Sequence, residues 1–118
     1  MAIHVYQYPK CSTCRRALAW LERSGAKFTK SDLVAERIPL EKLEDLYRRS
    51  KLPIAKLFNT SGESYRAGGF KDRLRTMTED EALRALAADG KLIKRPIVDS
   101  GATVLVGFDE GAYARHFR

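Results

Sequence analysis

Residues 3–24 read IHVYQYPKCSTCRRALAWLERS, and this stretch predicts a strand followed directly by a helix. Residues 3–8 are rich in β-branched and aromatic side chains, which favour extended structure. Pro9 then breaks the strand, and the hydroxyl of Ser12 or Thr13 can cap a helix that continues to the end of the stretch. The turn between strand and helix is the most informative position in the chain.

This turn carries the two cysteines of the chain, Cys11 and Cys14, as Cys-Ser-Thr-Cys. A helix N-terminus presents unpaired N–H groups and the positive end of the helix dipole, which favour thiolate over thiol at Cys11. In a helix, residues three positions apart have Cα atoms roughly 5 Å from each other, and a disulfide can span this distance. The pair therefore predicts a redox site in which Cys11 is the nucleophile and Cys14 is the resolving thiol.

The helix after the turn has one apolar face. At three- and four-residue spacing, this face holds Cys14, Ala17, Leu18 and Leu21. The charged residues of the helix lie largely outside this face. We therefore expect Cys14 to point inward, Cys11 to lie at the exposed end and Gly25 to stop the helix.

The middle of the chain predicts one more strand and one more helix before a less regular stretch. A strand is expected over 28–33, which completes a right-handed βαβ unit. A second amphipathic helix is expected with Pro39 in its first turn and its end near Arg49. Residues 54–77 contain several turn sequences, and the pattern leaves their structure open.

The last part of the chain has clearer signals. Residues 78–81, Thr-Glu-Asp-Glu, form a capping box for a helix that Gly90 should close. Residues 96–99 and 103–106 flank a Ser-Gly pair and predict an antiparallel hairpin. A short helix is expected over 109–117.

This order of elements is typical of an α/β, thioredoxin-like plan with a helical insertion over about 36–92. The chain has 118 residues, of which 44% are hydrophobic, which is enough to bury one core. We therefore expect a single domain over 1–118.

Composition also limits where the protein works and what it binds. The first residues lack the features of a signal peptide, and no segment approaches about 20 uninterrupted apolar residues. We expect a cytoplasmic monomer that does not bind membranes. The net charge of +7 could attract an acidic partner, but charge describes encounter rather than fold, and direct nucleic-acid binding is not expected.

The cysteine pair has two other interpretations. Cys-x-x-Cys supplies half of many zinc sites, and the thiols could also be ordinary core residues. A structural zinc ion takes four ligands, however, and the chain has no second cysteine pair. The two histidines, His4 and His116, are expected to be surface or packing residues. A redox role is therefore favoured, and no metal is expected.

Arg95 and Pro96 form a second candidate feature. Proline suits the start or edge of a strand because it gives up a ladder hydrogen bond. A sharper hypothesis is that Pro96 is cis and lies beside Cys11. The guanidinium of Arg95 could be a solvated charge or a planar donor that holds a thiolate or an oxyanion. Its position next to the proline favours a functional role.

Three motifs together resemble the arsenate reductase-like family, which includes Spx-type regulators and small glutathione-linked relatives. The motifs are PKCSTCRR at 9–16, KRPIV at 94–98 and LVGF at 105–108. The resemblance covers nearly the whole chain. It implies an ArsC-type thioredoxin-like fold with a central mixed four-stranded sheet, a helical insertion and a cis peptide bond at Pro96.

The residues and the resemblance together define a candidate site. The catalytic residues are expected to be Cys11, Cys14 and Arg95. Substrate binding is assigned to Lys10, Ser12, Thr13, Arg15, Asn59 and Pro96. The favoured function is thiol–disulfide oxidoreduction on glutathione or a protein disulfide, with glutathione or thioredoxin as reductant and no tightly bound cofactor.

Two alternatives follow from the same resemblance. Spx-type regulators sense oxidation through paired cysteines and bind the α subunit of RNA polymerase, although this chain has Lys51-Leu52-Pro53-Ile54 where the contact surface of those regulators includes a glycine. Arsenate-reducing members use one cysteine with three arginines. Only Arg95 matches one of those arginines, and Asn59 and Gly107 occupy the other two positions. Arsenate reduction is therefore less favoured than thiol exchange.

Overall fold

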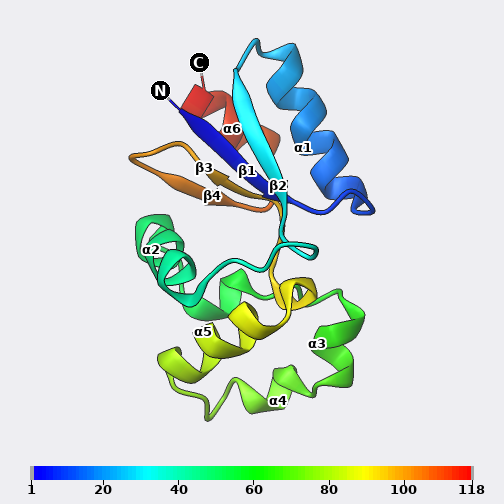
Figure 1. Cartoon of the computed structure of the whole chain (residues 1–118), viewed down its shortest axis with the longest axis vertical. Helices are drawn as coiled ribbons and strands as arrows, with labels where there is room; N and C mark the ends of the chain where they lie inside the picture. The colour runs from blue at the N-terminus through cyan, green and yellow to red at the C-terminus, as the bar shows by residue number, and fades with distance from the viewer. Residues whose placement is uncertain (1, 118) are drawn as a thin grey trace. The chain divides into compact units, whose positions relative to one another are not determined.

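The computed structural model describes residues 2–117, and their contacts group into two compact units. The first unit comprises Met1–Asp32 and Arg95–Arg118, and the second comprises Leu33–Lys94. The first unit contains the sheet, and the second contains short helices (Figure 1).

Four strands form one mixed sheet in the first unit. β1 (Ile3–Gln7) pairs in parallel with β2 (Phe28–Asp32) and antiparallel with β3 (Ile97–Asp99), and β3 pairs antiparallel with β4 (Val104–Val106). The strand order is β2-β1-β3-β4. This arrangement confirms the predicted α/β class, the parallel β1–β2 pair and the C-terminal hairpin.

Two helices pack against this sheet, α1 (Ser12–Arg23) and α6 (Glu110–Phe117). The buried cluster beneath them comprises Val5, Ala17, Trp20, Leu21, Val98 and Tyr113. The predicted inner face of the first helix is confirmed, since Leu18 packs against this cluster, but the prediction omitted the buried Trp20. The indole ring of Trp20 meets the ring of Tyr113 edge to face, with 5.6 Å between ring centroids, so packing against α6 selects the larger side chain.

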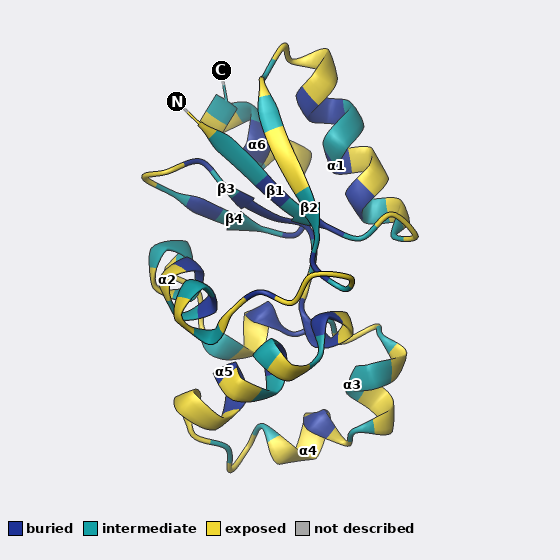
Figure 2. Cartoon of the chain, viewed as in Figure 1, coloured by how far each residue is buried: buried dark blue, intermediate teal, exposed yellow. Residues whose placement is uncertain are grey.

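The second unit is built from helices and short helical turns. These are α2 (Leu40–Ser50), η1 (Ile54–Leu57), α3 (Glu63–Ala67), α4 (Phe70–Arg73), α5 (Glu79–Ala88) and η2 (Gly90–Leu92). Each helix of ten residues or more turns a buried stripe inward, as Figure 2 shows for α2 and α5. The prediction that Pro39 lies in the first turn of α2 was wrong, because Pro39 is the N-cap that precedes this turn. Lys51 ends the helix in the left-handed conformation.

The N-terminus of α5 has the predicted capping box. The hydroxyl of Thr78 accepts the N–H of Glu81 at 3.1 Å, and the Glu81 carboxylate accepts the N–H of Thr78 at 2.8 Å. The predicted role of Gly90 as the stop of this helix was wrong, because α5 ends at Ala88 and is capped by Asp89. Gly90 is instead required by close packing, since a Cβ atom there would collide with the carbonyl oxygen of Leu33.

None of the helices formed by residues 2–117 combines the length and the apolar character needed to cross a membrane.

Candidate functional site

The sulfur of Cys11 caps the first turn of α1. Cys11 has extended backbone angles (φ −99°, ψ 117°), and its Sγ atom accepts the backbone N–H of Cys14 at 3.3 Å. The N–H of Cys11 donates to the carbonyl oxygen of Tyr8 at 3.0 Å, which closes the turn after β1. The prediction that Ser12 or Thr13 caps the helix was therefore wrong, because the tight turn after Tyr8 brings Cys11 itself to the cap position.

The surroundings of Cys11 favour its thiolate. Partial burial by itself would raise the pKa of this thiol. Hydrogen bonds from the thiol and backbone N–H of Cys14, together with a hydrogen bond and the positive charge of Arg95, outweigh burial and lower the pKa below its ordinary value. Cys11 is also only partly buried, which is the environment of reactive rather than inert cysteines.

Cys14 lies in the opposite environment. Its side chain is fully buried on the inner face of α1. Burial, then the hydrogen bond with Cys11 and the charge of Cys11, raise the pKa of Cys14 to about 12. The two cysteines are therefore unequal, with an accessible sulfur that favours the thiolate beside a buried thiol that keeps its proton.

Arg95 completes this group of charges. Its guanidinium hydrogen-bonds to Cys11 and lies over the ring of Tyr8, with 4.9 Å from Cζ to the ring centroid. The peptide bond between Arg95 and Pro96 is cis, as predicted from the sequence. Pro96 is buried, and its carbonyl oxygen accepts the N–H of Gly107 at 2.8 Å. The structure thus brings Cys11, Cys14 and Arg95 together within the first unit.

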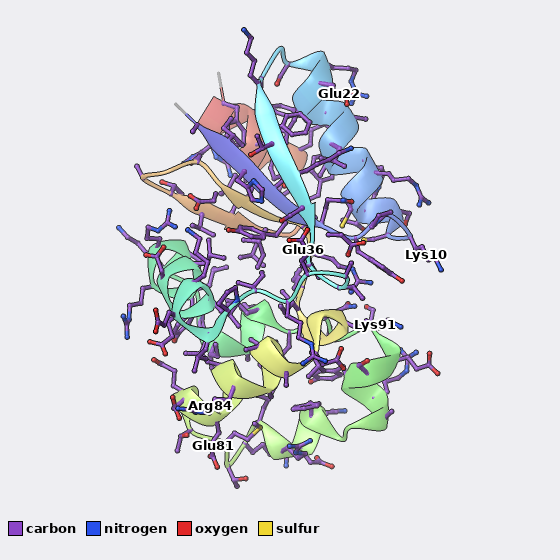
Figure 3. The ribbon with its side chains drawn as sticks, viewed as in Figure 1. Lys10, Glu22, Glu36, Glu81, Arg84 and Lys91 are labelled. Carbon is purple, nitrogen blue, oxygen red and sulfur yellow. The ribbon has the colours of Figure 1, made fainter. Side chains whose placement is uncertain are left out.

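The predicted binding residues of the turn lie on the same segment as the two cysteines. Lys10 is exposed beside the start of α1, whereas Glu22 lies toward the other end of the helix (Figure 3). The guanidinium of Arg15 donates to the carbonyl oxygen of Pro9 at 2.9 Å, so it supports the backbone of the turn. Ser12 is exposed, and the hydroxyl of Thr13 accepts a 3.4 Å hydrogen bond from Arg16.

Asn59 belongs to the second unit. Its N–H donates to the carbonyl oxygen of Leu92 at 2.7 Å, and its carbonyl oxygen accepts the N–H of Gly62 at 3.1 Å. These bonds hold its backbone next to the single bridge between Phe58 and Ile93. Its predicted participation in the Cys11 site stays a prediction.

Tyr8 is the residue of the site that the sequence reasoning missed. It was assigned only to the end of the first strand, yet its backbone and its ring both contact the site. The sequence signal for Tyr8 was weak. An aromatic residue directly precedes the Pro-Lys-Cys turn, but nothing in the neighbouring sequence shows that the guanidinium of Arg95 packs on its ring.

Metal ligands do not gather anywhere in the part of the chain that the structure describes, since no three His, Cys, Asp or Glu side chains form a group that could hold an ion. His4 lies on β1, where its ring nitrogens hydrogen-bond to the hydroxyls of Thr29 at 2.7 Å and Ser31 at 2.9 Å. Its contacts are those of a packing residue of the sheet surface.

The sequence model of the ArsC family matches residues 6–116. The chain belongs to the ArsC family. YusI of Bacillus subtilis, a protein described as uncharacterized, is 43% identical over 117 residues, which cover 99% of each chain. The global transcriptional regulator Spx of Lactiplantibacillus plantarum is 22% identical over 94% of this chain and 83% of its own length.

Two solved structures place this ArsC-family chain in the same fold. An ArsC family related protein from Bacteroides fragilis is 38% identical with a TM-score of 0.95, over 100% of this chain and 98% of that one. The arsenate reductase from Vibrio cholerae is 28% identical with a TM-score of 0.80, over 88% and 87% of the two chains. The fold is therefore thioredoxin-like of the ArsC type, and its relatives carry both regulatory and reductase names.

Proposed function

We propose that this protein is a thiol–disulfide oxidoreductase in which Cys11 is the nucleophile and Cys14 is the resolving thiol. One observation carries the proposal: in the partly buried residue Cys11, the Sγ atom accepts the N–H of Cys14 at 3.3 Å and also a hydrogen bond from Arg95. Both contacts stabilise the thiolate, which is the reactive form of cysteine. An inert core thiol would need neither of them.

The first step is attack on a disulfide. The Cys11 thiolate forms a new S–S bond with one sulfur of the substrate, and the second substrate sulfur leaves as a thiolate with the electron pair of the broken S–S bond. Solvent protonates this leaving group. The product is a mixed disulfide between Cys11 and the retained half of the substrate.

The second step uses Cys14. Once Cys11 is in a mixed disulfide, it no longer carries the charge that helps to raise the pKa of Cys14, although burial still does. Cys14 loses its proton to solvent and attacks the Sγ atom of Cys11, and the second half of the substrate leaves as a thiolate. The substrate disulfide is thereby reduced to two thiols, and the protein dithiol is oxidised to a disulfide.

Regeneration requires a dithiol or two monothiols from outside. We propose glutathione or a thioredoxin as this reductant, in keeping with the resemblance of the turn and of Gly107-Phe108 to thiol-exchanging relatives. Two glutathione molecules would supply the two electrons and leave as glutathione disulfide.

Glutathione-dependent reduction of a small disulfide tests the proposal. Cys11→Ser should abolish turnover, and Cys14→Ser should accumulate a mixed disulfide on Cys11 that intact-mass measurement detects. Glu22→Ala, at an exposed position toward the other end of α1, is the control for a surface change in the same helix. Turnover that survives Cys11→Ser would end the proposal.

A regulatory function is the second candidate, because the chain is similar to Spx over 94% of its length. The same disulfide would then act as a sensor, and the partner proposed from the resemblance is the α subunit of RNA polymerase. Exposed Lys51 ends α2 with φ 58° in the region where those regulators have a glycine. Binding of the purified α subunit to the reduced and the oxidised protein tests this candidate, and no binding in either state removes it.

Arsenate reduction is less well supported by the side chains. The two positions that the resemblance assigns to further arginines hold the uncharged Asn59 and Gly107, and Gly107 has φ 82°, which disfavours a residue with a side chain. Arg95 alone gives an oxyanion little charge-assisted binding. Brisk turnover of arsenate with glutathione or glutaredoxin would show that this reasoning is wrong.

A further inference from the structure

Tyr8 contacts all three residues of the candidate site. Its carbonyl oxygen accepts the N–H of Cys11 at 3.0 Å, and its backbone hydrogen-bonds to the sulfur of Cys14. Its ring lies under the guanidinium of Arg95, 4.9 Å from Cζ to the centroid. The backbone contacts would survive any side-chain substitution, whereas the contact with Arg95 depends on the ring.

The guanidinium of Arg95 needs such a support. The hydrogen bond between Gly107 and the carbonyl oxygen of Pro96 fixes the main chain next to Arg95, but the arginine side chain beyond it has several rotatable bonds. A thiolate gains from a cation only while that cation stays close. The face of an aromatic ring attracts a guanidinium and restricts it to a plane above the ring.

We infer that Tyr8 is a positioning residue for the nucleophile, and that its ring holds the guanidinium of Arg95 against the sulfur of Cys11. This inference rests on the proposed function, because it explains how the attacking thiolate is kept ready. Tyr8 acts through Arg95 and carries out no bond-making step. The aromatic face is the feature that matters, and the hydroxyl is dispensable.

The test is the pH dependence of Cys11 alkylation by iodoacetamide in the fully reduced protein, followed by mass spectrometry of the Cys11 peptide. Tyr8→Phe keeps the aromatic face, so Cys11 in this variant should be alkylated at the wild-type rate. Tyr8→Leu keeps an apolar side chain but removes the aromatic face. This substitution should slow the alkylation of Cys11 at low pH by about two- to fivefold, the factor that corresponds to the free energy of an exposed cation–π contact. It should also move the midpoint of the pH dependence of alkylation to higher pH.

A double-mutant cycle shows whether the effect passes through Arg95. Arg95→Gln alone should slow alkylation, and adding Tyr8→Leu to Arg95→Gln should slow it no further. The matched control is Phe70→Leu, which removes the ring beneath a different guanidinium in the second unit, that of Arg73 at 4.2 Å. This control should leave the alkylation profile of Cys11 unchanged.

Three results would overturn the inference. One is a pH profile of Cys11 alkylation that Tyr8→Leu leaves unchanged. Another is that Tyr8→Leu slows alkylation equally in the wild-type and the Arg95→Gln background. The third is loss of folding in Tyr8→Leu while Tyr8→Phe folds, because the ring would then have a structural role. The proposed function fails by a different result, the survival of disulfide reduction in Cys11→Ser, so the two failures are distinguishable.

Discussion

The hydroxyl of Tyr113 donates a 2.8 Å hydrogen bond to the carbonyl oxygen of Gly107. Tyr113 is 1% exposed, and burial, with a smaller contribution from the charge of Cys14, raises the pKa of its hydroxyl, so it stays a neutral donor. Gly107 in turn donates its N–H to Pro96, next to Arg95. Two hydrogen bonds thus connect α6 to the segment that carries the arginine of the site.

Tyr113→Phe should therefore destabilise the protein. The substitution keeps the ring but leaves a buried carbonyl oxygen without its donor, at a cost of about 1–2 kcal/mol. Urea unfolding measures the change as a lower midpoint. Tyr47→Phe is the control, because the hydroxyl of Tyr47 donates to Glu79 at the same 2.8 Å but at an exposed position. Equal losses in the two variants would contradict the role assigned to burial.

Iodoacetamide should label the two cysteines of the reduced protein at very different rates near neutral pH. Cys11 is partly exposed and its pKa is lowered, whereas burial raises the pKa of Cys14 to about 12. Peptide mass spectrometry after short labelling should find the Cys11 peptide modified first. Urea-unfolded protein is the control and should lose this preference. Equal labelling in the folded state would show that the two environments are alike.

The free energy of unfolding of the reduced protein should fall as the pH rises above about 9, through Cys14. Burial raises the folded-state pKa of Cys14 from the ordinary 9.0 to about 12. Between these values the unfolded chain has released a proton that the folded chain still holds, so rising pH favours unfolding. Below this window both states hold the proton, and the contribution is constant.

Urea unfolding of the wild type and of Cys14→Ser, measured below and above pH 9, tests whether Cys14 lowers the free energy of unfolding as the pH rises. Tyr113, whose pKa is raised mainly by burial, contributes a decline to both proteins; only the smaller part that comes from the charge of Cys14 is lost in Cys14→Ser. Cys11 has a lowered pKa, so its contribution grows with pH only below 9 and is constant above. A wild type that loses no more stability than Cys14→Ser at high pH would contradict the prediction.

Thr78→Ala should cost about 1 kcal/mol of stability, because it removes the hydroxyl that accepts the N–H of Glu81 at the start of α5. Denaturant unfolding measures the loss. Thr76→Ala is the matched control, since the hydroxyl of Thr76 makes only a long 3.4 Å hydrogen bond to the carbonyl oxygen of Arg73. A loss in Thr76→Ala as large as in Thr78→Ala would show that the cap is not the cause.

The sequence predicted the features that depend on neighbouring residues. The Cys-x-x-Cys turn, the capping box at Thr78 and the hairpin of β3 and β4 all follow from side chains within a few positions of one another. The fold class followed from their order along the chain. The cis bond at Pro96 was implied by the family resemblance, and the structure confirms it.

Tertiary structure alone decided the contacts between distant residues. Tyr8 and Arg95 lie far apart in the sequence, and the pairing of β1 with β3 brings the segments that carry them together. Gly90 matches the sequence pattern of a helix end, yet glycine is required there because a side chain would collide with the backbone of Leu33. Local propensity acts over one or two turns of chain, whereas packing acts between any surfaces that the fold places in contact. The sequence by itself therefore determined which residues are candidates for the chemistry, and the fold determined which groups lie in contact with them.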